Sequence, residues 1–191
     1  MNEAGVVRVS FMPFPDATKE TDMDKMQLEK KELKELLTKC WMTHDAMWFY
    51  HCLQECGIEK TNKVNRAAVK ALATVEITRL KKAAGVERLE TFGEFWDFFQ
   101  FTMATLTGDF MKYSFESKEM NHICGIWHQC FAYEGVKMLG MIDQYECGIM
   151  DRVESWFDTL GIKYEVEPKV TRCMMHTEGR CYRDYTFFFG R

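Results

Sequence analysis

The sequence predicts an α+β protein, in which about three N-terminal helices pack on a small antiparallel sheet that one further helix crosses. Up to about residue 108, apolar residues recur at the helical spacings of three and four. Beyond that point apolar and polar residues alternate, as they do in half-buried strands. We therefore expect one domain, with an irregular arm over 1–22, a helical part over 23–108 and a sheet-and-helix part over 109–191.

The first helix is expected to run from Met26 to Gly57, because glycine commonly follows the last turn of a helix. One long stripe of apolar and ring side chains follows its length, and we expect the stripe to be buried. The members of the stripe are Leu33, Leu36, Leu37, Cys40, Trp41, His44, Met47, Trp48 and His51.

Capping residues delimit two further helices. The second is expected to begin at Thr61 or Asn62, both favoured N-cap types, and to stop at Gly85. The third is expected to begin at the T-F-G-E sequence of residues 91–94, which has the spacing of a capping box, and to end at Gly108.

Beyond residue 108, the pattern of apolar residues predicts two strands, a helix and two more strands. In chain order these elements are expected at 111–118, 122–130, 147–160, 163–173 and 181–189. The last two strands are expected to form a hairpin, with Glu178 and Gly179 in its turn. Such a hairpin would hold Cys173 and Cys181 near each other across its two strands.

Composition and charge argue against two classes of protein, those that bind nucleic acid and those that span a membrane. The net charge of −4 argues against nucleic-acid binding, and no apolar run reaches the ~18 residues of a membrane span. The N-terminus lacks a basic start followed by an apolar stretch, so we expect a cytoplasmic protein. In that reducing compartment the eight cysteines are expected to be thiols rather than disulfides.

The first candidate site is the segment W-M-T-H-D-A-M-W-F. Here His44 is a candidate acid, base or ligand, with Asp45 to orient it and with Trp41 and Trp48 as pocket walls that bind substrate. The alternative is a core histidine satisfied by one hydrogen bond. Glu76 lies beside the apolar side of the second helix and needs a partner there, for which His44 is a candidate through an ion pair or a shared metal.

The second candidate site is a set of cysteines at the ends of expected elements. Cys130, Cys147, Cys173 and Cys181, with His176, are candidate ligands of zinc or another divalent transition metal, because thiolates bind zinc well. Simple burial of the four thiols is an alternative. A third interpretation is a thiolate nucleophile paired with a histidine, for which His122, His128 and His176 are the candidates.

Cys147 has an additional interpretation. It begins an expected helix, where the pKa of a thiol is lowered, and Asp151 follows on the same face four residues later. Both residues are therefore candidate catalytic groups. Trp127 and Arg172, which accompany the cysteines in the sequence, are assigned to substrate binding, as is Glu76.

The same residues carry a resemblance to a known family. The segments C-F-A-Y-E-G, Y-E-C-G-I-M-D and V-T-R-C-M-M-H-T-E-G-R-C-Y resemble the C-terminal half of the L-2-amino-thiazoline-4-carboxylic acid hydrolase-like family. The matching positions are Cys130, Cys147, Asp151, Arg172, Gly179 and Cys181. The segment W-M-T-H-D-A-M-W-F resembles a block in a related, mostly uncharacterised group of anaerobe proteins, so that the match covers roughly residues 38–189.

The spacing of Cys147, Cys173 and Cys181 also resembles the zinc-binding end of the vinyl-4-reductase-type ligand-sensing domain. That domain has a glutamate just before the cysteine pair, where this sequence has Val170. The fourth ligand would then be Cys130, His176 or Glu167.

Two function classes follow from the residues and the resemblances. One is a small cytoplasmic hydrolase that acts on a sulfur- or nitrogen-containing heterocycle or a related C–N or C–S bond, assisted by a metal or a thiolate. The other is a non-catalytic ligand-binding module, in which zinc staples the sheet and an aromatic pocket holds an apolar small molecule. Either class is compatible with a homo-oligomer.

Overall fold

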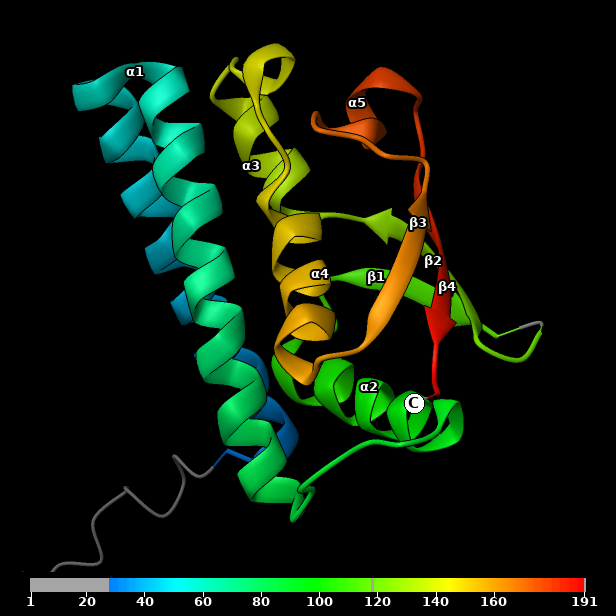
Figure 1. Ribbon diagram of the computed structural model, residues 1–191. Helices are drawn as coiled ribbons and strands as arrows, with labels where there is room; N and C mark the ends of the chain where they lie inside the picture. The colour runs from blue at the N-terminus through cyan, green and yellow to red at the C-terminus, as the bar shows by residue number, and fades with distance from the viewer. Residues whose placement is uncertain (1–27, 118, 191) are drawn as a thin grey trace, which may run out of the picture.

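A long helical hairpin, α1 (Lys30–Ala84), begins the part of the chain that the structure describes. This computed structural model describes residues 28–117 and 119–190, so the expected irregular arm over 1–22 lies outside the described residues. Gly57, with φ at 73°, interrupts α1, and the chain turns back on itself there (Figure 1). A positive φ suits glycine because it has no Cβ. We call residues 30–56 the first arm of α1 and residues 58–84 its second arm.

The third predicted helix is α2 (Phe92–Leu106), and its capping box is confirmed. The Thr91 side chain accepts a hydrogen bond from the amide of Glu94 at 3.3 Å, and the Glu94 carboxylate accepts one from the amide of Thr91 at 3.1 Å. These two bonds satisfy amides that have no partner within the helix. The helix ends at Leu106, two residues before the expected Gly108.

Within the described residues the sheet has four strands, which pair antiparallel in the order β1-β2-β4-β3. Their bounds are β1 (Lys112–Glu116), β2 (His122–Gln129), β3 (Lys163–Glu167) and β4 (Cys181–Phe188). Helices cover one face of the sheet, so the predicted α+β class is confirmed (Figure 1). Alternate residues of β2 and β4 point into the core on that face, among them Ile123 and Trp127 opposite Tyr185 and Cys181.

The crossing helix is α4 (Gly148–Leu160), which packs between the two arms of α1 and the sheet (Figure 1). Gly161 ends it with φ at 71°, as the sequence predicts. The sequence did not predict α3 (Phe131–Met138), because its eight residues are too few to show a clear helical period. A short 3₁₀ helix, η2 (Ile142–Gln144), follows it.

The predicted hairpin between the last two strands is wrong in its detail. β3 ends at Glu167, before Pro168, and a short helix, α5 (Met174–Thr177), stands between the strands. Gly179 does have the expected positive φ, at 72°. Cys173 and Cys181 are therefore not partners across two strands, and other backbone contacts position each of them.

The prediction that the stripe on the first arm is buried is wrong as well. Leu37 is 59% exposed and Trp48 is 63% exposed, while Thr38 and Met42 are the buried residues of that arm. Trp41 is the half-buried exception within the stripe. Both sides of this arm carry apolar residues, and spacing alone does not say which side meets the core.

The main core lies between α1, α2, α4 and the inner face of the sheet. It is rich in aromatic rings, and its members include Ile77, Leu80, Phe95, Phe99, Trp156, Phe157, Tyr185 and Phe187. Two smaller apolar clusters join it at the end of the sheet that carries the cysteines. Among the described residues, no helix combines the length and apolar character that crossing a membrane requires.

Candidate functional site

Four cysteines from four segments converge at one end of the sheet. Cys130, Cys147 and Cys173 are the N-cap residues of α3, α4 and α5, and Cys181 is the first residue of β4. All eight cysteines of the chain are free thiols. We call these four residues the thiol cluster. The sequence predicts that they form one site together with His176, because they lie at the ends of elements.

Backbone pairing explains how the thiol cluster forms. An isolated β-bridge joins Glu146 to Arg172, and the amide of Cys147 donates to the carbonyl of Thr171 at 3.0 Å. These contacts place the loops of Cys147 and Cys173 side by side. In the sheet, Cys181 lies opposite Trp127, three residues before Cys130. Two separate backbone pairings thus bring together cysteines that lie as far apart in the sequence as 130 and 181.

Burial dominates the electrostatics of the thiol cluster. Burial raises the pKa of Cys147 to about 12 and that of Cys181 to about 11, and it also raises the pKa of Cys130 and Cys173. Neighbouring thiols add to the rise in pKa of Cys130, Cys147 and Cys181. The thiols are therefore neutral near pH 7, so the predicted lowering of the pKa of Cys147 is wrong.

Backbone amides offset part of this rise in pKa. For each of the three N-cap cysteines, the amides two and three residues further on favour the thiolate, as helix N-termini do. These amides belong to Ala132 and Tyr133, Ile149 and Met150, and Met175 and His176. Burial outweighs them, but they would become stabilising partners once a metal had displaced the thiol protons.

The predicted ligand His176 does not point to a metal site. Its Nε2 lies 2.7 Å from the carboxylate of Asp143, on the outer side of the cluster. Across residues 28–117 and 119–190, no three side chains of His, Cys, Asp or Glu already stand in metal-binding geometry. The four thiols are nevertheless a matched set of soft donors, which is the type that zinc and related ions prefer.

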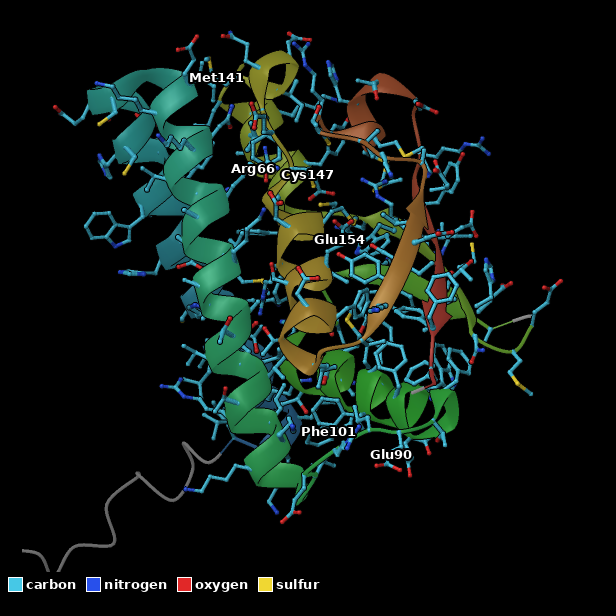
Figure 2. All side chains as sticks on the ribbon, in the orientation of Figure 1. Arg66, Glu90, Phe101, Met141, Cys147 and Glu154 are labelled. Carbon is cyan, nitrogen blue, oxygen red and sulfur yellow. The ribbon has the colours of Figure 1, made fainter. Side chains whose placement is uncertain are left out.

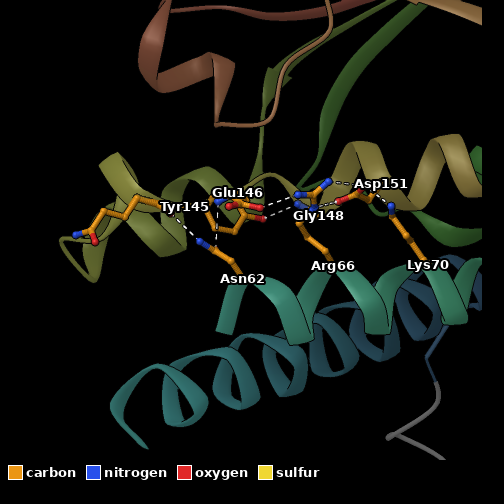
Figure 3. Close-up of polar contacts among 8 residues, drawn as sticks. Asn62, Arg66, Lys70, Tyr145, Glu146, Gly148 and Asp151 are labelled. Carbon is orange, nitrogen blue, oxygen red and sulfur yellow. Dashed lines mark hydrogen bonds and ion pairs between the residues drawn. The ribbon is translucent and has the colours of Figure 1, made fainter. Parts of the chain in front are cut away.

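The second arm of α1 fixes the loop that carries Cys147 (Figure 3). The buried side chain of Asn62 donates to the carbonyl of Gln144 at 2.7 Å and accepts from the amide of Glu146 at 3.2 Å. Arg66 donates to the carboxylates of Glu146, at 2.6 Å, and Asp151. Figure 2 shows Arg66 beside the start of α4, near Cys147.

Asp151 is thus part of an ion-pair network. It pairs with Arg66 and, at 3.0 Å, with Lys70. The sequence proposed Asp151 as a catalytic partner of Cys147, but in the structure its carboxylate is occupied by two cations. Its place on the first turn of α4 also suits a negative charge.

Replacing Arg66 with alanine is expected to lower the free energy of unfolding by about 2–4 kcal/mol. The reason is that Asp151 is nearly buried and would keep only Lys70 as a partner. Urea denaturation of the variant measures the change. Lys63→Ala, an exposed position on the same arm, is the control, and equal stability of the two variants would contradict the role assigned to Arg66.

The predicted His44 site lies elsewhere, on the outer surface of α1. The His44 side chain is exposed, and its Nε2 accepts a hydrogen bond from the indole N–H of Trp48 at 3.1 Å. Asp45 lies 3.9 Å from the other ring nitrogen. Trp48 is itself exposed, so these residues form no enclosed pocket wall. The His44 block and the thiol cluster are therefore two separate places in the fold.

Glu76 has partners other than the His44 that the sequence suggested. Its carboxylate accepts two hydrogen bonds from the guanidinium of Arg152 and one, at 2.9 Å, from the indole of Trp156. The Arg152 guanidinium also lies over the rings of Trp41 and Trp156. Glu76 and Trp41 thus serve to join α1 to α4, and no open space for a substrate separates them from Arg152.

The two other predicted substrate residues lie near the thiol cluster. Trp127 is buried against Cys181 and Met150. Arg172 is exposed and donates to the carbonyl of Asp143 at 3.3 Å. Two surface hollows formed by described residues lie at β3 and at the α1–α2 connection, and neither is lined by a cysteine or His44.

Sequence reasoning missed Arg183, which is only 2% exposed. Its guanidinium donates to the carbonyl of Tyr182 at 2.8 Å and lies 3.4 Å from the sulfur of Met174. Burial raises the pKa of Cys181, and the positive charge of Arg183 opposes that rise. The alternation of β4 places Arg183 on the same face as Cys181, and this signal was available in the sequence.

Comparison of the sequence with protein-family models and with curated proteins, and of the fold with solved structures, finds no match. The resemblance to the thiazoline hydrolase-like family therefore stays a prediction. The function proposed below therefore rests on the residues of this chain and on their geometry.

Proposed function

We propose that this protein is a zinc-stapled, non-catalytic module, in which Cys130, Cys147, Cys173 and Cys181 hold one divalent ion. The observation that carries the proposal is the gathering of these four thiols, from four separate segments, at one end of the sheet. Cys147 packs in the same apolar clusters as Cys181 and Cys173, and Cys130 is near enough to affect the pKa of Cys147. Four thiolates form a closed tetrahedral site, which is the usual form of structural zinc.

The surroundings of the cluster support a metal more than a nucleophile. A thiol nucleophile needs a lowered pKa, whereas burial raises the pKa of these four thiols. The candidate histidines have other neighbours: His176 lies against Asp143, His122 against Asp184, and His128 against Ser114. A metal would supply the positive charge that converts buried thiols to thiolates, and the nearby amides and Arg183 would stabilise that charge.

A zinc ion held here would reinforce the bridge between Glu146 and Arg172, which joins the short segments around the cysteines. Cys173 and Cys181 flank the short α5, while Cys130 and Cys147 flank α3 and η2. These segments lack long helices or paired strands of their own. The binding of an apolar small molecule, which the sequence suggested for such a module, stays a prediction, because the two hollows described above are lined by neither the cysteines nor His44.

Metal analysis of the purified protein tests the proposal. We expect about one zinc per chain, with four sulfur neighbours at about 2.3 Å by X-ray absorption. The Cys173→Ala, Cys181→Ala variant should lose the metal, while the matched Cys40→Ala, Cys56→Ala variant, altered at exposed positions, should keep it.

Two results would contradict the proposal. One is unchanged metal content in the cluster variant. The other is a site with three sulfur ligands and one water, because an open position is typical of catalytic zinc and would favour the hydrolase predicted from the sequence.

A further inference from the structure

The outer side of the first arm of α1 is an uncharged helix face. Between Leu33 and His51, the residues on this side are those of the stripe without Trp41, and none is Asp, Glu, Lys or Arg. Leu33, Leu36, Leu37, Met47 and Trp48 are among the most exposed large apolar residues that the structure describes. Helices on the surface of a monomer usually carry charge on their outer side.

The spacing within this face is that of a helix-pairing seam. Leu33, Leu37, Cys40, His44, Met47 and His51 follow one another at alternating steps of four and three residues. That repeat of 3.5 keeps one narrow stripe aligned with a partner helix, whereas packing on a globular core uses a wider stripe. We call these six residues the seam.

The second arm of α1 extends the uncharged face. Opposite its contacts with α4, the exposed residues Val64, Ala68, Ala71 and Val75 repeat the same steps of four and three. The two arms flank α4 on one side of the hairpin, so their outer sides both face away from α4 (Figure 1). The hairpin therefore presents two neighbouring apolar stripes on its outer side.

We propose that a second copy of this chain covers the seam, with the two first arms packed antiparallel so that two hairpins form a four-helix bundle. The alternating steps support a helical partner. The seam is complementary to a second copy of itself, and this identifies the partner as another copy of this chain. An antiparallel pair centred between Cys40 and His44 sets Leu37 against the partner's Met47, and Cys40 against the partner's His44.

Charge at the ends of the seam favours the antiparallel direction. Lys30 precedes the seam and Glu55 follows it, and both lie toward the same flank of the helix. Antiparallel packing brings Lys30 of one arm beside Glu55 of the other, and it also opposes the two helix dipoles. Parallel packing would place like charges together at each end.

The area is adequate for a stable pair. An arm of this length spans about 40 Å, and two helices side by side are about 20 Å wide. The resulting face of roughly 800 Å² per copy is what a stable pair of proteins typically buries on each side. The polar ends would form the rim around an apolar centre, as in other interfaces.

Sedimentation equilibrium of the full chain tests the proposal. We expect a mass twice that of the 22.6-kDa chain. Leu37→Glu with Met47→Glu should weaken association at least about 100-fold, because both charges would be buried at the centre of the interface. Met138→Glu is the control, since Met138 is 86% exposed on α3, and it should leave the mass unchanged. Circular dichroism verifies that each variant keeps its helices.

Disulfide cross-linking tests the direction without weakening the interface. In a background of Cys52→Ser and Cys56→Ser, His44→Cys should cross-link two chains through the native Cys40 of the partner. Adding Cys40→Ser should abolish that link. Cross-linking of Cys40 to itself in the chain that retains His44 would indicate parallel arms and overturn the arrangement.

A monomeric full chain would overturn the proposal outright, whether residues 1–27 or solvent cover the seam. So would a dimer whose mass the seam variant does not change. These outcomes are independent of metal content, and the dimer proposal does not depend on zinc.

Discussion

Replacing Glu76 with alanine is expected to lower the free energy of unfolding by about 3–5 kcal/mol. Glu76 is 6% exposed, and its carboxylate is the counter-ion of Arg152, whose own side chain is also largely buried. Without Glu76 the guanidinium would remain in the interior without a negative partner, and the indole N–H of Trp156 would lose its acceptor. Urea denaturation followed by tryptophan fluorescence measures the loss.

A double variant separates the ion pair from simple packing. Replacing both Glu76 and Arg152 with methionine removes both charges and keeps a polarisable side chain against Trp41 and Trp156. We expect the double variant to be more stable than Glu76→Ala, because no buried charge is left without a partner. Glu87→Ala, at an exposed position, should change little. A double variant less stable than Glu76→Ala would contradict this account.

Metal removal is expected to have the second large effect, and to reverse the pH dependence of stability. Binding of zinc to a site that exists only in the folded state adds its binding free energy to folding, so chelation should lower the free energy of unfolding by at least about 5 kcal/mol. In the metal-loaded protein this contribution should disappear as the pH falls and the thiolates regain protons. This prediction rests on the proposed four-thiolate site.

Without metal, stability should fall as the pH rises. The folded-state pKa of Cys147 is raised to about 12 and that of Cys181 to about 11, above the ~8.5 of an unfolded thiol. Below about pH 8.5 the thiols are protonated in both states, so the full stability is present. Between about 8.5 and the folded values only the unfolded chain loses protons, which favours unfolding.

Denaturation curves at pH 7 and pH 10, with and without a chelator, measure these opposite slopes. The Cys147→Ser variant should show a smaller loss at pH 10 in the metal-free form, because one buried thiol is gone. Cys56→Ser is the matched control at an exposed thiol. Equal slopes in all three proteins would show that the thiols of the cluster do not govern the alkaline transition.

The elements of this fold are largely readable from the sequence, because local chemistry sets their ends. The capping box at Thr91–Glu94 and the glycines at 57, 85 and 161 each act within a few residues. The seam shows the limit of such reasoning. Leu37 and Met42 are both apolar, and only the tertiary packing of the first arm makes Met42 the buried one.

The position of the four cysteines at element ends was readable from the sequence, but the arrangement of the site was not. His176, which the sequence placed with the cysteines, lies against Asp143 instead. The bridge between Glu146 and Arg172, which aligns two of their loops, joins short irregular segments that carry no periodic signal. The partner of Glu76 was equally unreadable, since Arg152 is one of many cations in the chain and nothing local links the two.

The bonds that join α1 to α4 and to the loop before it also bear on when, during synthesis, the inner polar groups of the hairpin find their partners. Asn62 bonds a carbonyl 82 residues away, Arg66 reaches a carboxylate 85 residues away, and Glu76 meets Arg152 at a separation of 76 residues. Contacts of such high sequence separation form late, because a long loop must close first. A nascent chain that ends before α4 would therefore carry a helical hairpin whose inner polar groups have only water as partner. We therefore expect the chain to become a folded unit only when its C-terminal half has left the ribosome, and not when the hairpin has been synthesised.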